Sequence, residues 1–132
     1  MSAGELVARW VVAFAITQAV ECPVYVRGFG VSLAVAFGAS AITHPIVCFV
    51  IPWVWERLYV AAITARPGMA LSANAYFVAY GALAESFAVV VEALYLARWA
   101  RLDARRAALA SLAANTASGL VGLACSGLFG WP

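Results

Sequence analysis

Four ionisable side chains interrupt long apolar stretches of this sequence: Glu21, His44, Glu85 and Glu92. A charged side chain at the centre of a lipid bilayer costs at least about 2.5 kcal/mol, so each of these residues needs an explanation. Two neighbouring carboxylates cannot both stay ionised in a low-dielectric site, and they can share one proton. Carboxylate and imidazole groups are also ligands for zinc, manganese or iron(II). These residue types predict a site for protons or for a divalent metal ion.

Uncharged polar residues accompany this group on the same helical faces. Ser40 and His44 are four residues apart, as are Ser111 and Asn115, and residues at this spacing share one face of a helix. Glu85 and Glu92 are seven residues apart and also share a face. Because each apolar segment has one polar face, the faces are expected to converge. The predicted polar cluster contains Ser40, Thr43, Ser111 and Asn115.

Composition places the chain in a membrane. Apolar residues make up 66% of its 132 residues and charged residues 11%, whereas soluble domains are about 45–50% apolar and about 25% charged. The net charge of +2 is too small to indicate a nucleic-acid partner. Glu5 stands where a signal peptide would carry basic residues, so we expect no cleavable signal. The spacing of Cys22, Cys48 and Cys125 fits neither a disulfide framework nor a zinc motif.

Four segments have the length of a membrane-spanning helix, about 20 residues. They cover about 6–26, 31–55, 71–99 and 107–129, with a tight turn at 27–30 and loops at 56–70 and 98–106. The five tryptophans fall near segment ends, as an interfacial belt requires: Trp10, Trp53, Trp55, Trp99 and Trp131. The prediction is a single all-α transmembrane domain over residues 1–132, an up-down-up-down bundle of four helices.

Arginine counts predict the orientation in the cell (inner) membrane. The first and third loops share one side and hold five arginines, against three on the other side. The positive-inside rule therefore places these two loops in the cytoplasm.

Depth separates the polar groups into two layers. At a rise of about 1.5 Å per residue, Glu21 and Glu92 each lie about 9 Å from the side of the first and third loops. His44 and Glu85 each lie roughly 20 Å from it, with Asn115 slightly shallower. One predicted layer is a carboxylate pair, and the other combines a carboxylate, an imidazole and an amide.

The sequence also indicates an internal repeat. An offset of 71 residues aligns four polar or charged positions without a gap. The pairs are Glu21 with Glu92, Arg27 with Arg98, Ser40 with Ser111, and His44 with Asn115. A tandem duplication of a two-helix hairpin explains these matches, and chance alignment is the alternative.

Two local features concern helix shape and packing. Pro23 and Pro45 each remove a backbone hydrogen bond, which predicts kinks and free carbonyl groups beside Glu21 and His44. The last segment carries a small residue at every fourth position, which predicts a packing face within the bundle, in a homo-oligomer or toward a membrane-complex partner. These positions are Ala110, Ala114, Ser118, Gly122, Ser126 and Gly130.

Short motifs resemble those of a family of small, uncharacterised bacterial four-helix integral membrane proteins. They are Glu-x-Pro at 21–23, Thr-His-Pro at 43–45, the glutamate pair at 85 and 92, and Asn-x-x-Ser at 115–118. The family often shows an Asn ahead of its Thr-His-Pro, where this chain reads Ser40-Ala41-Ile42. The resemblance covers nearly the whole chain and implies the same fold and polar cluster, but no reaction.

Three functions remain open at this stage. The polar cluster joins the helices in a structural or helper subunit of a membrane complex, which is the leading reading. Alternatively, the protein binds or transports protons or a divalent metal ion. The third reading is an intramembrane enzyme with His44 as general base and Glu85 orienting it, although no phosphate loop or HExxH zinc motif is present in the sequence.

Overall fold

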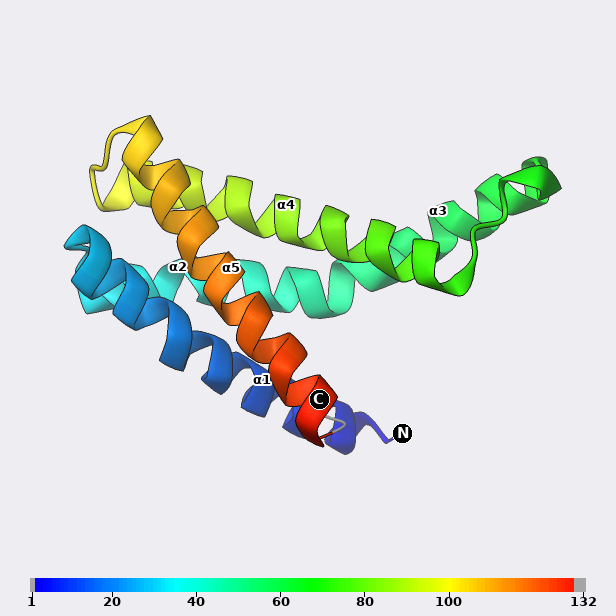
Figure 1. Cartoon of the computed structure of the whole chain (residues 1–132), viewed down its shortest axis with the longest axis horizontal. Coiled ribbons are helices and arrows are strands. Elements are labelled where there is room, and N and C mark those ends of the chain that lie inside the picture. The colour runs from blue at the N-terminus through cyan, green and yellow to red at the C-terminus, as the bar shows by residue number, and fades with distance from the viewer. Residues whose placement is uncertain (1, 130–132) are drawn as a thin grey trace.

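The computed structural model describes residues 2–129, and over these residues the chain is helical without any strand (Figure 1). The elements are α1 (Ala3–Pro23), η1 (Val24–Gly28), α2 (Leu33–Pro45), η2 (Ile46–Val50), α3 (Ile51–Ala65), η3 (Pro67–Met69), α4 (Ala73–Trp99) and α5 (Ala104–Phe129). Within this part of the chain, four helical stretches are long and apolar enough to cross a membrane. They are Gly4–Gly28, Leu33–Ala65, Ala73–Trp99 and Ala104–Leu128. The predicted all-α integral membrane fold is confirmed.

The helices form a ring. α1 packs against α2 and α5, and α4 packs against the same two helices from the other side. The order around the bundle is therefore α1, α2, α4, α5, as expected for up-down-up-down connections through short loops. Gly38 of α2 faces the hydroxyl end of Tyr95 on α4, which leaves no room for a side chain at Gly38.

Helix ends follow the local sequence. Ser2 and Glu5 form a capping box at the start of α1, with hydrogen bonds of 2.7 and 3.2 Å. Ser72 caps α4 by accepting from the amide of Ala75. The Asp103 side chain accepts from the Arg106 amide at 3.0 Å, so α5 begins at Ala104, earlier than the predicted residue 107.

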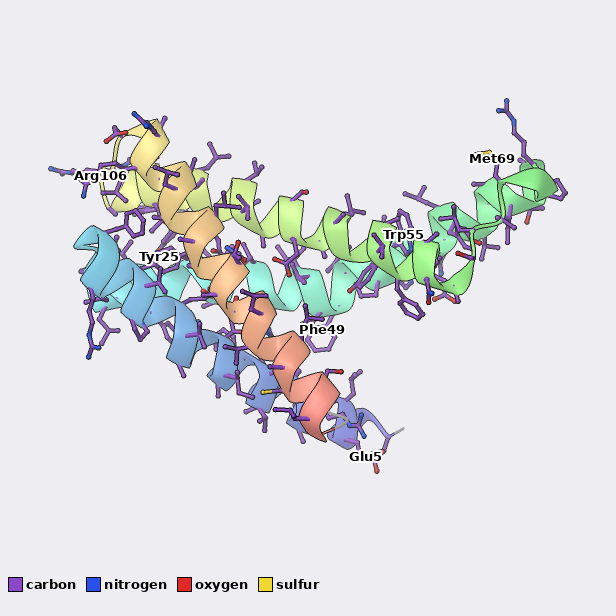
Figure 2. The ribbon with its side chains drawn as sticks, in the orientation of Figure 1. Glu5, Tyr25, Phe49, Trp55, Met69 and Arg106 are labelled. Carbon is purple, nitrogen blue, oxygen red and sulfur yellow. The ribbon has the colours of Figure 1, made fainter. Side chains whose placement is uncertain are left out.

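The predicted loop at 56–70 is wrong over its first part, because the helix continues to Ala65. No helix-breaking residue occurs from Glu56 to Arg66, before Pro67 and Gly68. Aromatic packing also holds this stretch against α4, with the Tyr59 and Tyr76 rings 4.8 Å apart. Figure 2 shows Trp55 between α3 and α4, and Met69 near the tip of this hairpin.

The first predicted turn also begins later than expected. Helical structure continues through Arg27 and Gly28 as the π-helical turn η1, directly after Pro23. Gly30, with φ of +70°, ends it in a conformation that glycine adopts readily. Pro45 is likewise followed by a π-helical segment, η2. Both prolines therefore change the helical hydrogen-bonding pattern where the sequence predicts a disturbance.

The small-residue face of α5 packs inside the bundle along its first half, where Ala110 and Ala114 are fully buried. Farther along, Gly122 is half-buried and Ser126 is exposed. Trp53 and Trp99 are exposed, as an interfacial position requires, whereas Trp10 packs against the rings of His44 and Phe49. The predictions for Gly130 and Trp131 lie outside the described residues.

Candidate functional site: an intramembrane carboxyl cavity

Glu92 on α4 is a buried carboxyl group that accepts three hydrogen bonds. It is 1% exposed and accepts hydrogen bonds from side chains on three other elements. Thr43 of α2 donates to Oε1 at 2.6 Å. Tyr25 of η1 and Asn115 of α5 donate to Oε2 at 2.5 and 2.7 Å. This one carboxyl group therefore joins every helix of the ring.

Glu21 on α1 has a similar environment. It is 2% exposed. Ser40 of α2 donates to its Oε2, and Ser118 of α5 donates to its Oε1 at 2.6 Å. Each glutamate thus receives hydrogen bonds from both α2 and α5, the two helices that lie between α1 and α4 in the ring.

Asn115 has a positioning partner in Ser111, one turn earlier on α5. The Asn115 side-chain amide donates to the Ser111 carbonyl at 3.0 Å and lies 3.3 Å from its hydroxyl oxygen. The Ser111 hydroxyl in turn donates to the Val89 carbonyl of α4 at 2.9 Å. Ser111 therefore orients the amide that reaches Glu92 and also ties α5 to α4.

A cavity of about 140 Å³ lies beside the two carboxyl groups. A water molecule needs roughly 10–15 Å³ on the same measure of space open to water, so several fit. The cavity has polar lining from each helix of the ring. The polar lining residues are Thr17, Glu21, Ser40, Thr43, His44, Glu85, Glu92, Asn115 and Ser118.

His44 lies at the cavity among aromatic rings. Its ring centroid is 5.2 Å from that of Phe14 and 6.1 Å from that of Trp10. Its Nδ1 lies 3.7 Å from the Cys48 sulfur, one helical turn away. Among the hydrogen bonds of the described residues, none joins His44 to Glu85, so the orienting contact expected of an acid–base pair is absent there.

Glu85 occupies a different position from the other two cavity glutamates. Its side chain is exposed on the surface of the chain, while also lining the cavity. A Cβ atom at Gly119 of α5 would lie 4.0 Å from Oε1 of Glu85, so this glycine leaves space beside the carboxyl group. Asn115, which sequence depth grouped with Glu85 and His44, bonds to Glu92 instead. Because Asn115 also lines the cavity with Glu85 and His44, its bond to Glu92 connects the two predicted layers.

Charge balance is the unusual property of this site. Three carboxyl groups and one imidazole line the cavity, and no arginine is among its lining residues in the described chain. Among the described residues, the hydrogen-bond donors to Glu21 and Glu92 are neutral hydroxyl or amide groups. An ionised carboxylate in a low-dielectric interior needs a neutralising partner. Protonation of a carboxyl group, or binding of a small cation, would provide such neutralisation.

The predicted metal ligands His44, Glu85, Glu21 and Glu92 all line this cavity. Within residues 2–129, however, no group of three or more His, Cys, Asp or Glu side chains is arranged to hold a metal ion. The oxygens of Glu21 and Glu92 accept from hydroxyl and amide donors. The divalent-metal hypothesis stays a prediction that this geometry does not strengthen.

Sequence reasoning brought most of these residues together but missed three roles. Thr17 lines the cavity one turn before Glu21, and its i, i+4 spacing was an available signal. Ser118 donates to Glu21, although its four-residue spacing predicts only a place on the packing face of the last helix. Tyr25 of η1 shares a helical face with Glu21 yet donates to Glu92 across the bundle, a partner that helical periodicity alone does not specify.

Fold and site together define a polytopic helical membrane protein with a carboxyl-lined cavity inside its bundle. Comparisons with protein-family models, with curated proteins and with solved structures find no match to the chain.

Proposed function

We propose that this protein binds protons within the membrane at Glu21 and Glu92 and exchanges them with water through the adjoining cavity. The observation that carries the proposal is the cavity itself, where three glutamates and a histidine meet without a basic residue among the lining groups. Protonation neutralises a carboxylate without adding any side chain to the site. Proton binding is therefore the simplest solution to the charge imbalance.

Glu85 provides the entrance of the proposed proton path. It is exposed on the molecular surface and lines the same cavity as the two buried glutamates. Intramembrane carboxyl groups and histidines arranged along a water-filled space form proton relays in transport proteins. In the proposed path, a proton passes from Glu85 through cavity water to Glu21 or Glu92.

A second candidate is a structural or helper subunit of a membrane complex. Its supporting observation is the hydrogen-bond network, which joins each helix of the ring through Glu21 and Glu92. Such bonds between membrane helices contribute about 0.6 kcal/mol each on average. They would hold the helices in register without any exchange of protons.

Proton flux into liposomes separates the two candidates. The purified protein is reconstituted with a pH-sensitive dye inside, and a potassium diffusion potential drives proton entry. We expect flux above that of empty liposomes, and its loss in Glu21→Gln and Glu92→Gln. Glu56→Gln is the matched control, because Glu56 is exposed on α3 outside the cavity. Absence of flux in the native protein would favour the structural role.

Three further assignments belong to the same proposal. The connections at residues 29–32 and 100–103 face the cytoplasm, because arginine is concentrated beside them. The membrane is the cell (inner) membrane, and the chain belongs with the small bacterial four-helix proteins that its motifs resemble. The orientation is tested with single cysteines and a thiol reagent that does not cross the membrane, added to intact cells. Cysteines in the connections at 29–32 and 100–103 should stay unlabelled, and their labelling would overturn the orientation.

A further inference from the structure

The second membrane span is interrupted at one level by three consecutive features. Pro45 ends α2, the π-helical segment η2 follows, and Pro52 lies in the first turn of α3. Proline removes a backbone hydrogen bond, and π-helical segments break the regular bonding of a helix. These are the recognised causes of bending in long helices.

The neighbouring helix, α4, contains a glycine at the same level of the bundle. Tyr80 of α4 donates a hydrogen bond to the Val47 carbonyl of η2 at 3.3 Å, which places these two positions side by side. The next residue of α4 is Gly81, and the space around a Cβ atom there is open. Glycine in a helix interior is about 1 kcal/mol less favourable than alanine, because it leaves the backbone more freedom.

Beyond this level, the chain forms a hairpin that packs mainly on itself. We call residues 51–80 the arm. Its two helices meet through the rings of Trp55, Tyr59 and Tyr76. None of the residues from Ile46 to Leu83, all of them described, is buried. Figure 1 shows the arm diverging from α1 and α5 and extending past both termini along the longest axis of the molecule.

The pivot level coincides with the edge of the cavity. Val47, which belongs to η2, lines the cavity, as do Ala84 and Glu85, which follow Gly81 by three and four residues on α4. We infer that the arm pivots as a unit about η2 and Gly81, and that this movement opens and closes the mouth of the cavity. The inference concerns access to the cavity, and it stands whether or not the cavity carries protons.

Pulsed electron spin resonance on the full chain in lipid nanodiscs tests the pivot. In a background with Cys22, Cys48 and Cys125 replaced by alanine, spin labels at Val78 and Leu123 report the distance from arm to α5. Both side chains are exposed, at 71% and 73%. Labels at Leu33 and Leu94, exposed at 65% and 67%, form a control pair outside the arm. We expect a wider distance distribution for the arm pair than for the control pair.

Two substitutions then identify the pivot. Gly81→Ala and Pro45→Ala should each narrow the arm distribution, because they restore regular helix. Gly122→Ala is the matched control, since it also adds a methyl group in open space, but on α5. An arm distribution as narrow as that of the control pair would overturn the inference. So would a wide distribution that neither substitution changes.

Thiol labelling tests the link to the cavity. Ala84 lines the cavity and is 4% exposed. A cysteine introduced there should react more slowly with a small water-soluble thiol reagent when Gly81→Ala is also present. Equal rates with and without Gly81→Ala would overturn the opening of the mouth, whatever the distance measurement shows.

Discussion

The two halves of this bundle differ in how they are held together. In the described chain, every buried residue lies between Glu21 and Thr43 or between Ala84 and Asn115. These two ranges form the half of the molecule that leads to the connections at 29–32 and 100–103, where Figure 2 labels Arg106. We call it the packed half. The distal half contains the arm, the start of α1 and the end of α5, and aromatic contacts hold the arm together.

The buried polar groups lie in the half of the bundle whose helices pack closely. Glu21 and Glu92 lie in the packed half, where small residues such as Ala36, Ala39 and Ala114 allow close helix contacts. Close backbones let short side chains such as serine reach a carboxyl group.

The distal half lacks this support, and Pro45, η2 and Pro52 stand at its start, where no residue of η2 is buried. The packed half also has a proline followed by a π-helical turn, Pro23 and η1, but there Tyr25 is fully buried and holds the turn in place. A rigid binding region beside a movable one is the arrangement that controlled access to a site requires.

The largest expected effect is the loss of packing at Leu96. Its side chain is fully buried, and Leu96→Ala should destabilise the protein by about 2–5 kcal/mol. Leu94→Ala, two residues earlier on α4, removes a side chain that is 67% exposed and should change stability much less. Unfolding in mixed detergent micelles measures both variants. Equal losses would contradict the assignment of the packed half.

The next effect is the loss of the acceptor at the centre of the network. Glu92→Ala leaves the donors of Tyr25, Thr43 and Asn115 without their partner. We expect a loss of about 2 kcal/mol, because three interhelical bonds disappear while one carboxyl group no longer needs to be buried. Glu56→Ala, at an exposed position, should be nearly neutral. The same unfolding assay measures both variants. An unchanged free energy of unfolding in Glu92→Ala would mean that the hydrogen-bond network does not stabilise the protein.

Asn115→Ala should have a smaller effect of about 1 kcal/mol. The substitution removes one donor to Glu92 and the local bond to Ser111, while Tyr25 and Thr43 still serve the carboxyl group. Asn74→Ala is the matched control, because Asn74 is exposed in the first turn of α4. A similar loss of unfolding free energy in both variants would mean that the buried contacts of Asn115 stabilise the protein no more than an exposed asparagine does.

The smallest expected change in stability belongs to Tyr80→Phe, at the boundary between the two halves. It removes the 3.3 Å hydrogen bond to the Val47 carbonyl and should cost about 0.5 kcal/mol or less. Its effect on the arm should be visible, however, as a shift of the distance between labels at Val78 and Leu123. An unchanged distance distribution would show that this hydrogen bond does not hold the arm in place.

Much of the fold was predictable because the membrane imposes simple rules. Length and hydropathy place a helix within each predicted segment, and the polar faces correctly bring Glu21, Ser40, Thr43 and Glu92 to one cavity. The continuation of α3 to Ala65 was missed, although residues 56–65 are mostly apolar and contain no helix-breaking residue. The polar pair Glu56-Arg57 suggested a loop, and aromatic contacts with α4 hold the helix there instead. The 71-residue repeat stays a prediction, as do the oligomeric state and any partner.

The hydrogen-bond partners within the site were harder to predict from the sequence. Periodicity shows which residues share a face, but it does not show which neighbouring helix that face meets. Tyr25 illustrates this limit, since it lies one turn from Glu21 and donates to Glu92. Ser118 is a second example, because a small residue on a packing face is also a hydrogen-bond donor.

Infrared spectroscopy of the carboxyl groups tests the central claim most directly. Carboxylic acids shielded from water absorb in a distinct C=O stretching region, which is recorded across a pH series for the protein in lipid. The account predicts a band in this region that changes with pH, weakens in the Glu21→Gln/Glu92→Gln double variant and is unaffected by Glu56→Gln. A band of the same strength in the double variant, or no shielded carboxylic acid at any pH, would contradict proton binding at this pair.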